Sequence, residues 1–158
     1  LMICNALDGK PLPVYGKGAN IRDWLHVEDH CAAIARVFEA GRVGRCYNIG
    51  GHAEKTNLEV VRAVCAILDQ LVPSARGSYA DQLTYVADRP GHDFRYAIDC
   101  SRIEAELGWK PSHKFDSGLR ETVRWYLEHT AWVENVRSGA YREWIAANYA
   151  HRACGGAN

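Results

Sequence analysis

The segment Ala87–His92 places a permanent cation beside a rigid turn and an imidazole. Pro90 pushes Arg89 toward extended geometry, and Gly91 permits backbone conformations that a Cβ atom forbids. The side chains of Arg89 and His92 could therefore face one target, and a cation with a hydrogen-bonding ring suits an anionic ligand. An ordinary Pro-Gly surface turn with two incidental polar neighbours fits the same residues. Taken alone, the segment leaves both interpretations open.

Two histidines offer a second kind of chemistry. His26 and His30 are four residues apart, with Glu28 and Asp29 between them, and this spacing could hold zinc on one face of a helix. However, His26 precedes the predicted helix, and no third ligand is spaced nearby. We therefore predict a structural role for both histidines and no metal site.

The six cysteines are scattered along the chain without a Cys-x-x-Cys pair. Cys31 and Cys65 fall within apolar helical patterns, where cysteine behaves as a small hydrophobic residue. We expect free, buried thiols, which agrees with a reducing compartment.

The elements that must position these residues alternate between helix and strand. Residues 28–40 are predicted to form a helix that ends at Gly41. One face of this helix carries Cys31, Ile34, Ala35 and Phe38. A short apolar strand is predicted at 46–49. Thr56 and Glu59 have the spacing of a capping box, which predicts a helix from there to Pro73.

The second half continues the same mixture. Leu83–Val86 reads as a strand, and residues 94–98 alternate with the period of an extended segment. Ser101 and Glu104 predict a further capping box, with a helix that stops at Gly108 and a buried Trp109 after it. Asp116 can cap a long helix, and a last helix is predicted at 141–148. The fold class is therefore α/β, with mixed helices and short strands.

Composition sets the limits on function. The chain has 158 residues, is 47% apolar, and can bury a core as one domain. Its 19 basic and 19 acidic residues balance, so no global field favours nucleic acid or an anionic membrane, and an anion site must be local. No apolar run approaches the roughly 20 residues of a membrane span, and Leu1–Leu7 is too short and lacks the basic lead of a signal peptide. We expect a cytoplasmic protein.

Six segments follow one another in the order and spacing of the dTDP-glucose 4,6-dehydratases, and the chain resembles this family from Leu1 to about Tyr149. They are Pro11–Gly16, Ile21–His30, Cys46–His52, Glu54–Asn57, Thr84–Asp93 and Glu106–Pro111. The family belongs to the extended short-chain dehydrogenase/reductases, which have a Rossmann-like fold. The resemblance implies a C-terminal nucleotide-sugar-binding domain over residues 1–149, followed by a flexible tail over 150–158.

The resemblance also shows what this sequence lacks. Such enzymes carry a Gly-x-x-Gly-x-x-Gly phosphate loop and a catalytic Tyr-x-x-x-Lys pair in an N-terminal half, and neither motif occurs here. The resemblance therefore implies that NAD is bound by that N-terminal half, that no catalytic or cofactor-binding residue lies in this segment, and that the complete enzyme is a homodimer.

The resemblance assigns substrate contacts to eight residues. The segment Pro13, Val14, Tyr15 borders the nucleotide, Arg22 meets the diphosphate, Asn57 makes a polar contact, Arg89 and His92 form a second phosphate grip, and Tyr149 closes over the substrate. Plainer roles are open for several of them. Tyr15 could cover a strand edge, Arg22 could pair with Asp23, Asn57 could simply start a helix, and Tyr141 could take the place of Tyr149.

The family converts dTDP-glucose to a 4-keto-6-deoxy sugar. A hydride leaves sugar C4 for NAD, water is lost across C5 and C6, and the hydride returns to C6. The resemblance implies that this chain holds the nucleotide sugar for that reaction and is inactive alone. Two alternatives stay open: a related epimerase or decarboxylase that acts on a UDP-sugar, and a stand-alone sugar-nucleotide-binding protein without catalysis.

Overall fold

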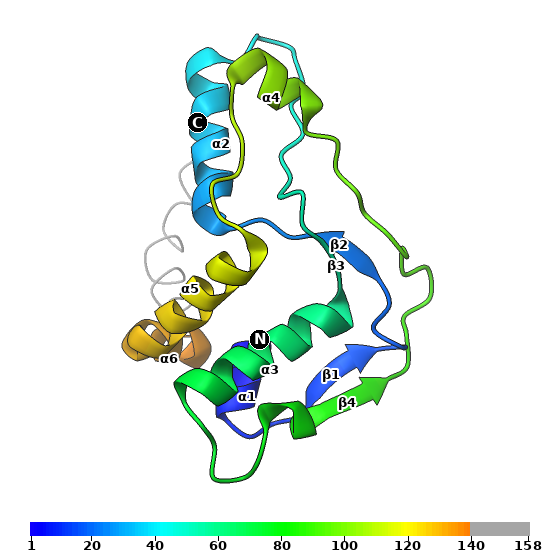
Figure 1. Ribbon diagram of the computed structural model, residues 1–158, viewed down its shortest axis with the longest axis vertical. Helices are drawn as coiled ribbons and strands as arrows, with labels where there is room; N and C mark the ends of the chain where they lie inside the picture. The colour runs from blue at the N-terminus through cyan, green and yellow to red at the C-terminus, as the bar shows by residue number, and fades with distance from the viewer. Residues whose placement is uncertain (140–158) are drawn as a thin grey trace, which may run out of the picture. The chain divides into compact units, whose positions relative to one another are not determined.

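The computed structural model describes residues 1–139 and divides the chain into two compact units, Leu1–Val123 and Arg124–Asn158. Figure 1 shows a mixture of helices and short strands, as predicted. The elements are α1 (Met2–Leu7), β1 (Leu12–Tyr15), β2 (Ile21–Asp23), α2 (Val27–Ala40), β3 (Glu54–Thr56), α3 (Asn57–Leu71), the 3-10 turn η1 (Tyr79–Gln82), β4 (Leu83–Val86), α4 (Ser101–Leu107), α5 (Phe115–Glu128) and α6 (Thr130–Ser138). Within residues 1–139, no helix combines the length and apolar character needed to cross a membrane.

Two short sheets organise the first unit (Figure 1). β1 runs parallel to β4, with Leu12 opposite Leu83 and Tyr15 opposite Val86, which confirms the predicted strand at 83–86. β2 runs antiparallel to β3. Because parallel strands end at the same edge, the segments that follow Tyr15 and Val86 leave the sheet side by side. Tyr15 ends β1 at this edge, and the segment with Arg89 and His92 follows β4 there.

The helix α3 packs against α1, β1 and η1 and forms one core of the first unit. Its start is the predicted capping box: the Glu59 amide donates to Thr56 Oγ1 at 3.2 Å, and the Thr56 amide donates to Glu59 Oε2 at 2.7 Å. The apolar stripe behind this cap is buried and comprises Val60, Val61, Val64, Cys65 and Leu68. The helix ends at Leu71, just before Pro73.

A second core joins α2 to α4, which lie beside each other in Figure 1. It consists of Ala33, Cys100, Ile103, Leu107 and the predicted core residue Trp109. The Nε atom of Arg36 also donates to the Leu107 carbonyl at 3.0 Å, so the end of α4 is tied to α2 by a polar contact as well. The backbone at Gly108 has a φ of +66°, which explains why a glycine ends this helix.

Two predicted extended segments do not form strands. Residues 46–49 belong to no sheet, because no strand among residues 1–139 runs beside them. Side chains of this segment still pack on the second core, and Arg102 donates to the Cys46 carbonyl at 2.9 Å. Residues 94–98 make a single parallel bridge, between Arg95 and Ile21. The alternation of Phe94, Tyr96 and Ile98 does not mark a buried face, because all three side chains are exposed, and neither apolar pattern could supply a pairing partner.

The prediction for α2 was right in its position and wrong in its buried face. The face that carries Ile34 and Phe38 is exposed, at 54% and 92%, whereas Ala33 lies in the core. Cys31, on this face, is exposed, and so is Cys46, which lies outside α2. Among the described cysteines, the expectation of buried thiols is therefore correct for Cys65 and Cys100 alone. The five described cysteines are free.

Two predicted caps are absent. Cys100, not Ser101, occupies the N-cap of α4 and caps it with no side-chain hydrogen bond. Asp99 replaces the expected box, because its Oδ1 accepts from the Ser101 amide at 2.9 Å. Asp116 lies inside the first turn of α5, which begins at Phe115. The predicted helix at 141–148 and the predicted tail at 150–158 lie outside the described residues.

The two isoleucines of the α2–α4 region give a matched test of this core. Ile103→Ala should lower the free energy of unfolding by about 2–5 kcal/mol, because the side chain is fully buried and leaves a cavity. Ile34→Ala, on the exposed face, should cost less than about 1 kcal/mol. Urea unfolding of both variants measures the difference, and equal losses would contradict the assignment of the two faces.

Candidate functional site

The edge where β1 and β4 end brings the first predicted substrate residues to the surface. Tyr15, the last residue of β1, is 48% exposed, and its ring makes an edge contact with the His92 ring at a centroid distance of 6.2 Å. Pro13 is half-buried, and Val14 is buried within the core. The aromatic ring of Tyr15 is thus available to a ligand, whereas Val14 can offer only its backbone.

Arg22 is held by backbone carbonyls and an aromatic ring. Its guanidinium donates to the carbonyls of Ile21 at 2.6 Å and Asp93 at 3.0 Å, and it lies 4.4 Å from the centroid of the Tyr96 ring. The alternative salt bridge to Asp23 is wrong. The Asp23 carboxylate instead accepts hydrogen bonds from the backbone amides of Gly51, at 2.9 Å, and Ala53, at 2.8 Å. These contacts fix the direction of the Arg22 side chain and leave its charge without a paired carboxylate among residues 1–139.

In the turn at 87–92, His92 and Arg89 have different surroundings. His92 Nδ1 lies 2.7 Å from Asp88 Oδ1, and the imidazole is only 6% exposed. The same carboxylate oxygen accepts the Arg89 amide at 2.9 Å. The hydrogen bond with His92 is the main cause that holds the pKa of Asp88 below its usual value. His92 therefore braces the turn, and Arg89 is its exposed cation.

The charges of the two predicted arginines act on the same phenol, that of Tyr96. The Tyr96 hydroxyl donates to the Asp93 carboxylate, and this hydrogen bond is the main reason that the pKa of Tyr96 is raised. The positive charges of Arg22 and Arg89 act on the same pKa in the opposite direction. The Arg22 guanidinium lies 4.4 Å from the centroid of the Tyr96 ring, and the charge of Arg89 reaches the same phenol electrostatically. The two cations are 67 residues apart in the sequence (89 − 22).

Asn57 is the first residue of α3, at the border of this cluster. Its amide donates to the carbonyl of Asn20 at 3.0 Å. The Asn20 side chain, itself buried, donates to the Asp93 carbonyl at 3.3 Å. The start of α3 is thereby connected to the loop that carries Arg89. Tyr149 and its alternative Tyr141 lie outside the described residues.

Sequence reasoning missed a buried carboxylate in the first turn of α2. Asp29 accepts three hydrogen bonds from two consecutive residues: Ser112 Oγ at 2.6 Å, Ser112 N at 3.1 Å and His113 N at 3.0 Å. Its Oδ1 also lies 3.1 Å from His113 Nδ1, the distance of an ion pair. Burial alone would raise the pKa of Asp29, but the hydrogen bonds from Ser112 and His113 together outweigh it and hold the pKa far below its usual value. The hydrogen bond to Asp29 is also the main reason that the pKa of His113 is raised.

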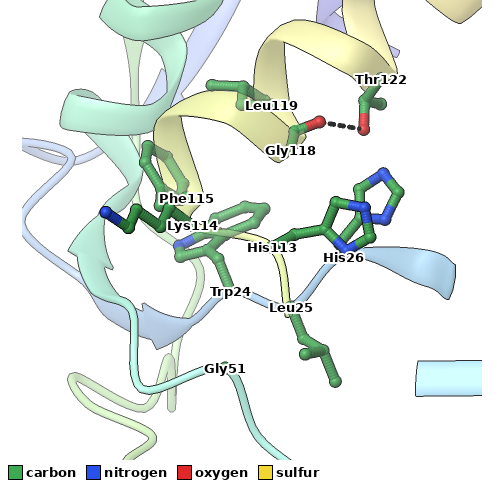
Figure 2. Close-up of a pocket in the computed structure, with 10 residues that line it drawn as sticks. All are labelled: Trp24, Leu25, His26, Gly51, His113, Lys114, Phe115, Gly118, Leu119 and Thr122. Carbon is green, nitrogen blue, oxygen red and sulfur yellow. Dashed lines mark hydrogen bonds between the residues drawn. The ribbon is translucent and has the colours of Figure 1, made fainter. Parts of the chain in front are cut away.

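A pocket of about 190 Å³ lies beside this network (Figure 2). Trp24, Phe115 and Leu119 form much of its apolar wall. Figure 2 also shows the imidazoles of His26 and His113 stacked on each other, at a centroid distance of 4.1 Å. Among the described residues, His26 and His113, with Glu121 nearby, could hold a metal ion. The sequence hinted at this place only through the His26 and His30 spacing, which suggested the wrong second histidine.

Comparison with known proteins gives the fold and its relatives. The family model described as GDP-mannose 4,6 dehydratase matches residues 1–122. A dTDP-glucose 4,6-dehydratase of Salmonella typhimurium is 61% identical over 152 residues, which cover 96% of this chain and 42% of the relative. The chain thus spans about two fifths of the length of the curated relatives that it matches.

Solved structures of related enzymes have a similar fold. The dTDP-glucose 4,6-dehydratase of Streptomyces venezuelae with NAD and TYD bound is similar at a TM-score of 0.72 and 46% identity, over 83% of this chain and 38% of that chain. A UDP-glucose 4-epimerase of Thermotoga maritima with UDP-glucose has a TM-score of 0.70 at 23% identity, over 80% of this chain and 38% of that chain, a likeness of fold alone. These similarities confirm the predicted fold class, a portion of a Rossmann-like short-chain dehydrogenase/reductase.

The Asp29 network predicts a specific loss of stability. Asp29→Asn should lower the free energy of unfolding at pH 7 by about 2–4 kcal/mol, because an amide has one acceptor oxygen for three buried donors and carries no charge to pair with His113. The folded pKa is depressed, so the wild-type advantage is complete above the ordinary carboxyl pKa near 4 and is lost as the pH falls below it. Urea unfolding from pH 3 to pH 8 measures both effects.

Asp116→Asn is the matched control, since Asp116 is exposed in the first turn of α5 and should cost less than about 1 kcal/mol. In Asp29→Asn, NMR titration should also find the His113 pKa lowered toward its ordinary value. An unchanged His113 pKa together with unchanged stability would refute the network.

Proposed function

Because the chain belongs to the nucleotide-sugar dehydratase family that the GDP-mannose 4,6 dehydratase model describes, we propose that it forms the nucleotide-sugar-binding part of a dTDP-glucose 4,6-dehydratase. The relatives it matches are more than twice its length, so the activity is that of a complete enzyme in which this part positions the substrate. Holding the nucleotide fixes the sugar relative to the reacting groups, and such positioning can lower a barrier by several kcal/mol.

The observation that carries the proposal is the pair of cations around Tyr96. The chain as a whole is neutral and has no global attraction for anions. Locally, Arg22 stacks on the Tyr96 ring, the segment 93–96 pairs with Ile21 beside it, and the exposed Arg89 in the same loop acts on that phenol electrostatically. The neighbouring carboxylates Asp88 and Asp93 are engaged by His92 and by Tyr96. A diphosphate would neutralise both guanidinium groups, and a planar guanidinium can bond two phosphate oxygens at once.

The remaining predicted contacts fit around this diphosphate. Tyr15 offers an exposed ring to the base, next to Pro13 and the backbone of Val14. Asn57 supplies a polar group at the start of α3. We assign His92 to support of the turn, with substrate contact through Arg89. The role of Tyr149 in closing the site stays part of the proposal.

NAD is assigned to the part of the complete enzyme that lies outside this sequence. No Gly-x-x-Gly-x-x-Gly loop and no Tyr-x-x-x-Lys pair occur in the 158 residues, so the chain has no residues that fit a dinucleotide or the family's base. A homodimeric assembly and a cytoplasmic location of the complete enzyme belong to the same proposal.

The diphosphate grip can be tested by calorimetric titration of the complete enzyme with dTDP. Arg89→Ala should weaken binding about ten- to a hundredfold, because a charge-assisted contact contributes roughly 1.5–3 kcal/mol. Arg22→Ala should lose a similar amount, and Arg22→Lys should restore only part of it, because lysine keeps the charge without the two-pronged geometry. Arg62→Ala, an exposed arginine on α3, is the control and should bind as wild type. If Arg89→Ala also binds as wild type, the grip is wrong.

The division of labour gives a second test. The purified 158-residue chain should neither retain NAD nor form 4-keto sugar from dTDP-glucose, and an added N-terminal half should produce turnover. Turnover by the chain alone would overturn the assignment. Tighter binding of UDP than of dTDP would favour a UDP-sugar epimerase or decarboxylase, and nucleotide binding without turnover in the complete protein would favour a non-catalytic binding protein.

A further inference from the structure

A cluster of potential metal ligands lies in the first unit, outside the arginine pair. His26, His113 and Glu121 each offer one ligand atom, and these atoms all lie within 4.8 Å of one another. They come from three places in the chain: the N-cap of α2, the segment before α5, and α5 itself. Two imidazole nitrogens and one carboxylate oxygen are a ligand set typical of zinc sites with an open fourth position.

His113 is oriented as a metal ligand requires. Its Nδ1 is engaged by Asp29 Oδ1 at 3.1 Å, so Nε2 is the nitrogen left for a ligand. Nε2 lies 3.5 Å from a Glu121 oxygen and 3.7 Å from a Glu28 oxygen. A carboxylate behind a ligating histidine fixes the tautomer and raises the basicity of the ring, an arrangement found at most protein metal sites.

His26 has a buried nitrogen that the described residues leave unsatisfied. Its Nδ1 is inaccessible and has no hydrogen-bond partner, which is rare for a buried polar atom. Gly118 makes room for the stacked rings, since a Cβ at this position would lie 3.2 Å from His26 Cδ2 and 3.4 Å from His113 Cβ. The packing thus preserves space around two imidazoles where a larger residue on α5 would crowd them.

The local charge favours a cation. Carboxylate oxygens of Asp29, Glu121 and Glu28 lie 3.1, 3.5 and 3.7 Å from the ring nitrogens of His113. Lys114 lines the same pocket, but Figure 2 shows its ammonium directed away from the two imidazoles. Among residues 1–139, no lysine or arginine forms an ion pair with these three carboxylates.

We propose that His26, His113 and Glu121 bind a zinc ion, with the fourth coordination position open to the pocket beside Trp24. Two ligand atoms at about 2.0–2.1 Å from a tetrahedral ion lie roughly 3.4 Å apart, so the ligand atoms must approach by about 1.4 Å at most. The Glu121 side chain is 51% exposed and can make this movement by rotation. Asp29 acts behind the site as a positioning residue for His113.

Calorimetric titration of the metal-free chain with zinc chloride tests the proposal. One zinc ion should bind per chain, and His26→Gln and Glu121→Gln should each weaken binding at least about tenfold. Glu121→Gln is the safer variant for folding because its side chain is half exposed, and far-UV circular dichroism checks every variant. Cobalt in place of zinc should give the visible spectrum of a tetrahedral site in the wild type and lose it in both variants.

Two controls separate this site from other ligands in the chain. His30→Gln removes the histidine four residues from His26 that does not belong to the cluster, and Cys154→Ser removes a thiol near the C-terminus. Both should bind zinc as wild type. No binding by the wild type, or equal binding by Glu121→Gln, His26→Gln and the wild type, would refute the site and leave His113 as a histidine held by carboxylates. The outcome is independent of dTDP binding.

Discussion

The buried carboxylate of Asp29 is the interaction on which the start of α5 and the pocket beside it depend. It lies in the first turn of α2 and accepts hydrogen bonds from residues more than 80 positions later in the chain. A buried carboxylate is costly unless its oxygens are satisfied, so the segment at Ser112 and His113 has little freedom to lie elsewhere. That segment determines where α5 begins. The pocket wall, the His113 tautomer and the stacking on His26 all follow from this one contact.

At the arginine pair, one backbone carbonyl holds two distant segments of the chain together, as Asp29 does at the start of α5. The Asp93 carbonyl accepts hydrogen bonds from Arg22 and from the buried Asn20. The Ile21 amide donates to the Phe94 carbonyl, and the Tyr96 amide donates to the Ile21 carbonyl. This pairing brings the Arg89 loop alongside β2, although the two are distant in sequence. A flexible arginine gains specificity from such contacts, because its rotamer freedom is lost before the ligand arrives and not on binding.

Local signals predicted local structure well. The Thr56–Glu59 box, the positions of α2 and β4, and the stop at Gly108 follow from hydrogen bonds or backbone preferences within a few residues. The signals failed where an element needs a partner. Residues 46–49 have the composition of a strand but no neighbour among residues 1–139, and the apolar face of α2 at Phe38 has nothing described to cover it.

For the candidate site, too, the sequence predicted individual residues but not the contacts between distant segments. Arg22 and Arg89 could be predicted because the segments around them match a family pattern, yet only the fold reveals their common neighbour Tyr96. His92 was predicted to contact the ligand, and the structure adds its contact with Asp88 and the burial of its side chain, which is 6% exposed. No sequence pattern could have joined His26 to His113, since 87 residues (113 − 26) separate them and Asp29 makes the connection.

The balanced composition conceals two local fields of opposite sign. Arg22 and Arg89 gather positive charge near Tyr96, whereas Asp29, Glu28 and Glu121 gather negative charge around His113. The side chains of each charged group are positioned by contacts with neutral or oppositely charged residues, and not by contacts with one another. At physiological ionic strength charges are screened beyond about 8 Å, so each field acts only on a ligand that enters its own site. A chain with no net charge can therefore select an anion in one place and a cation in another.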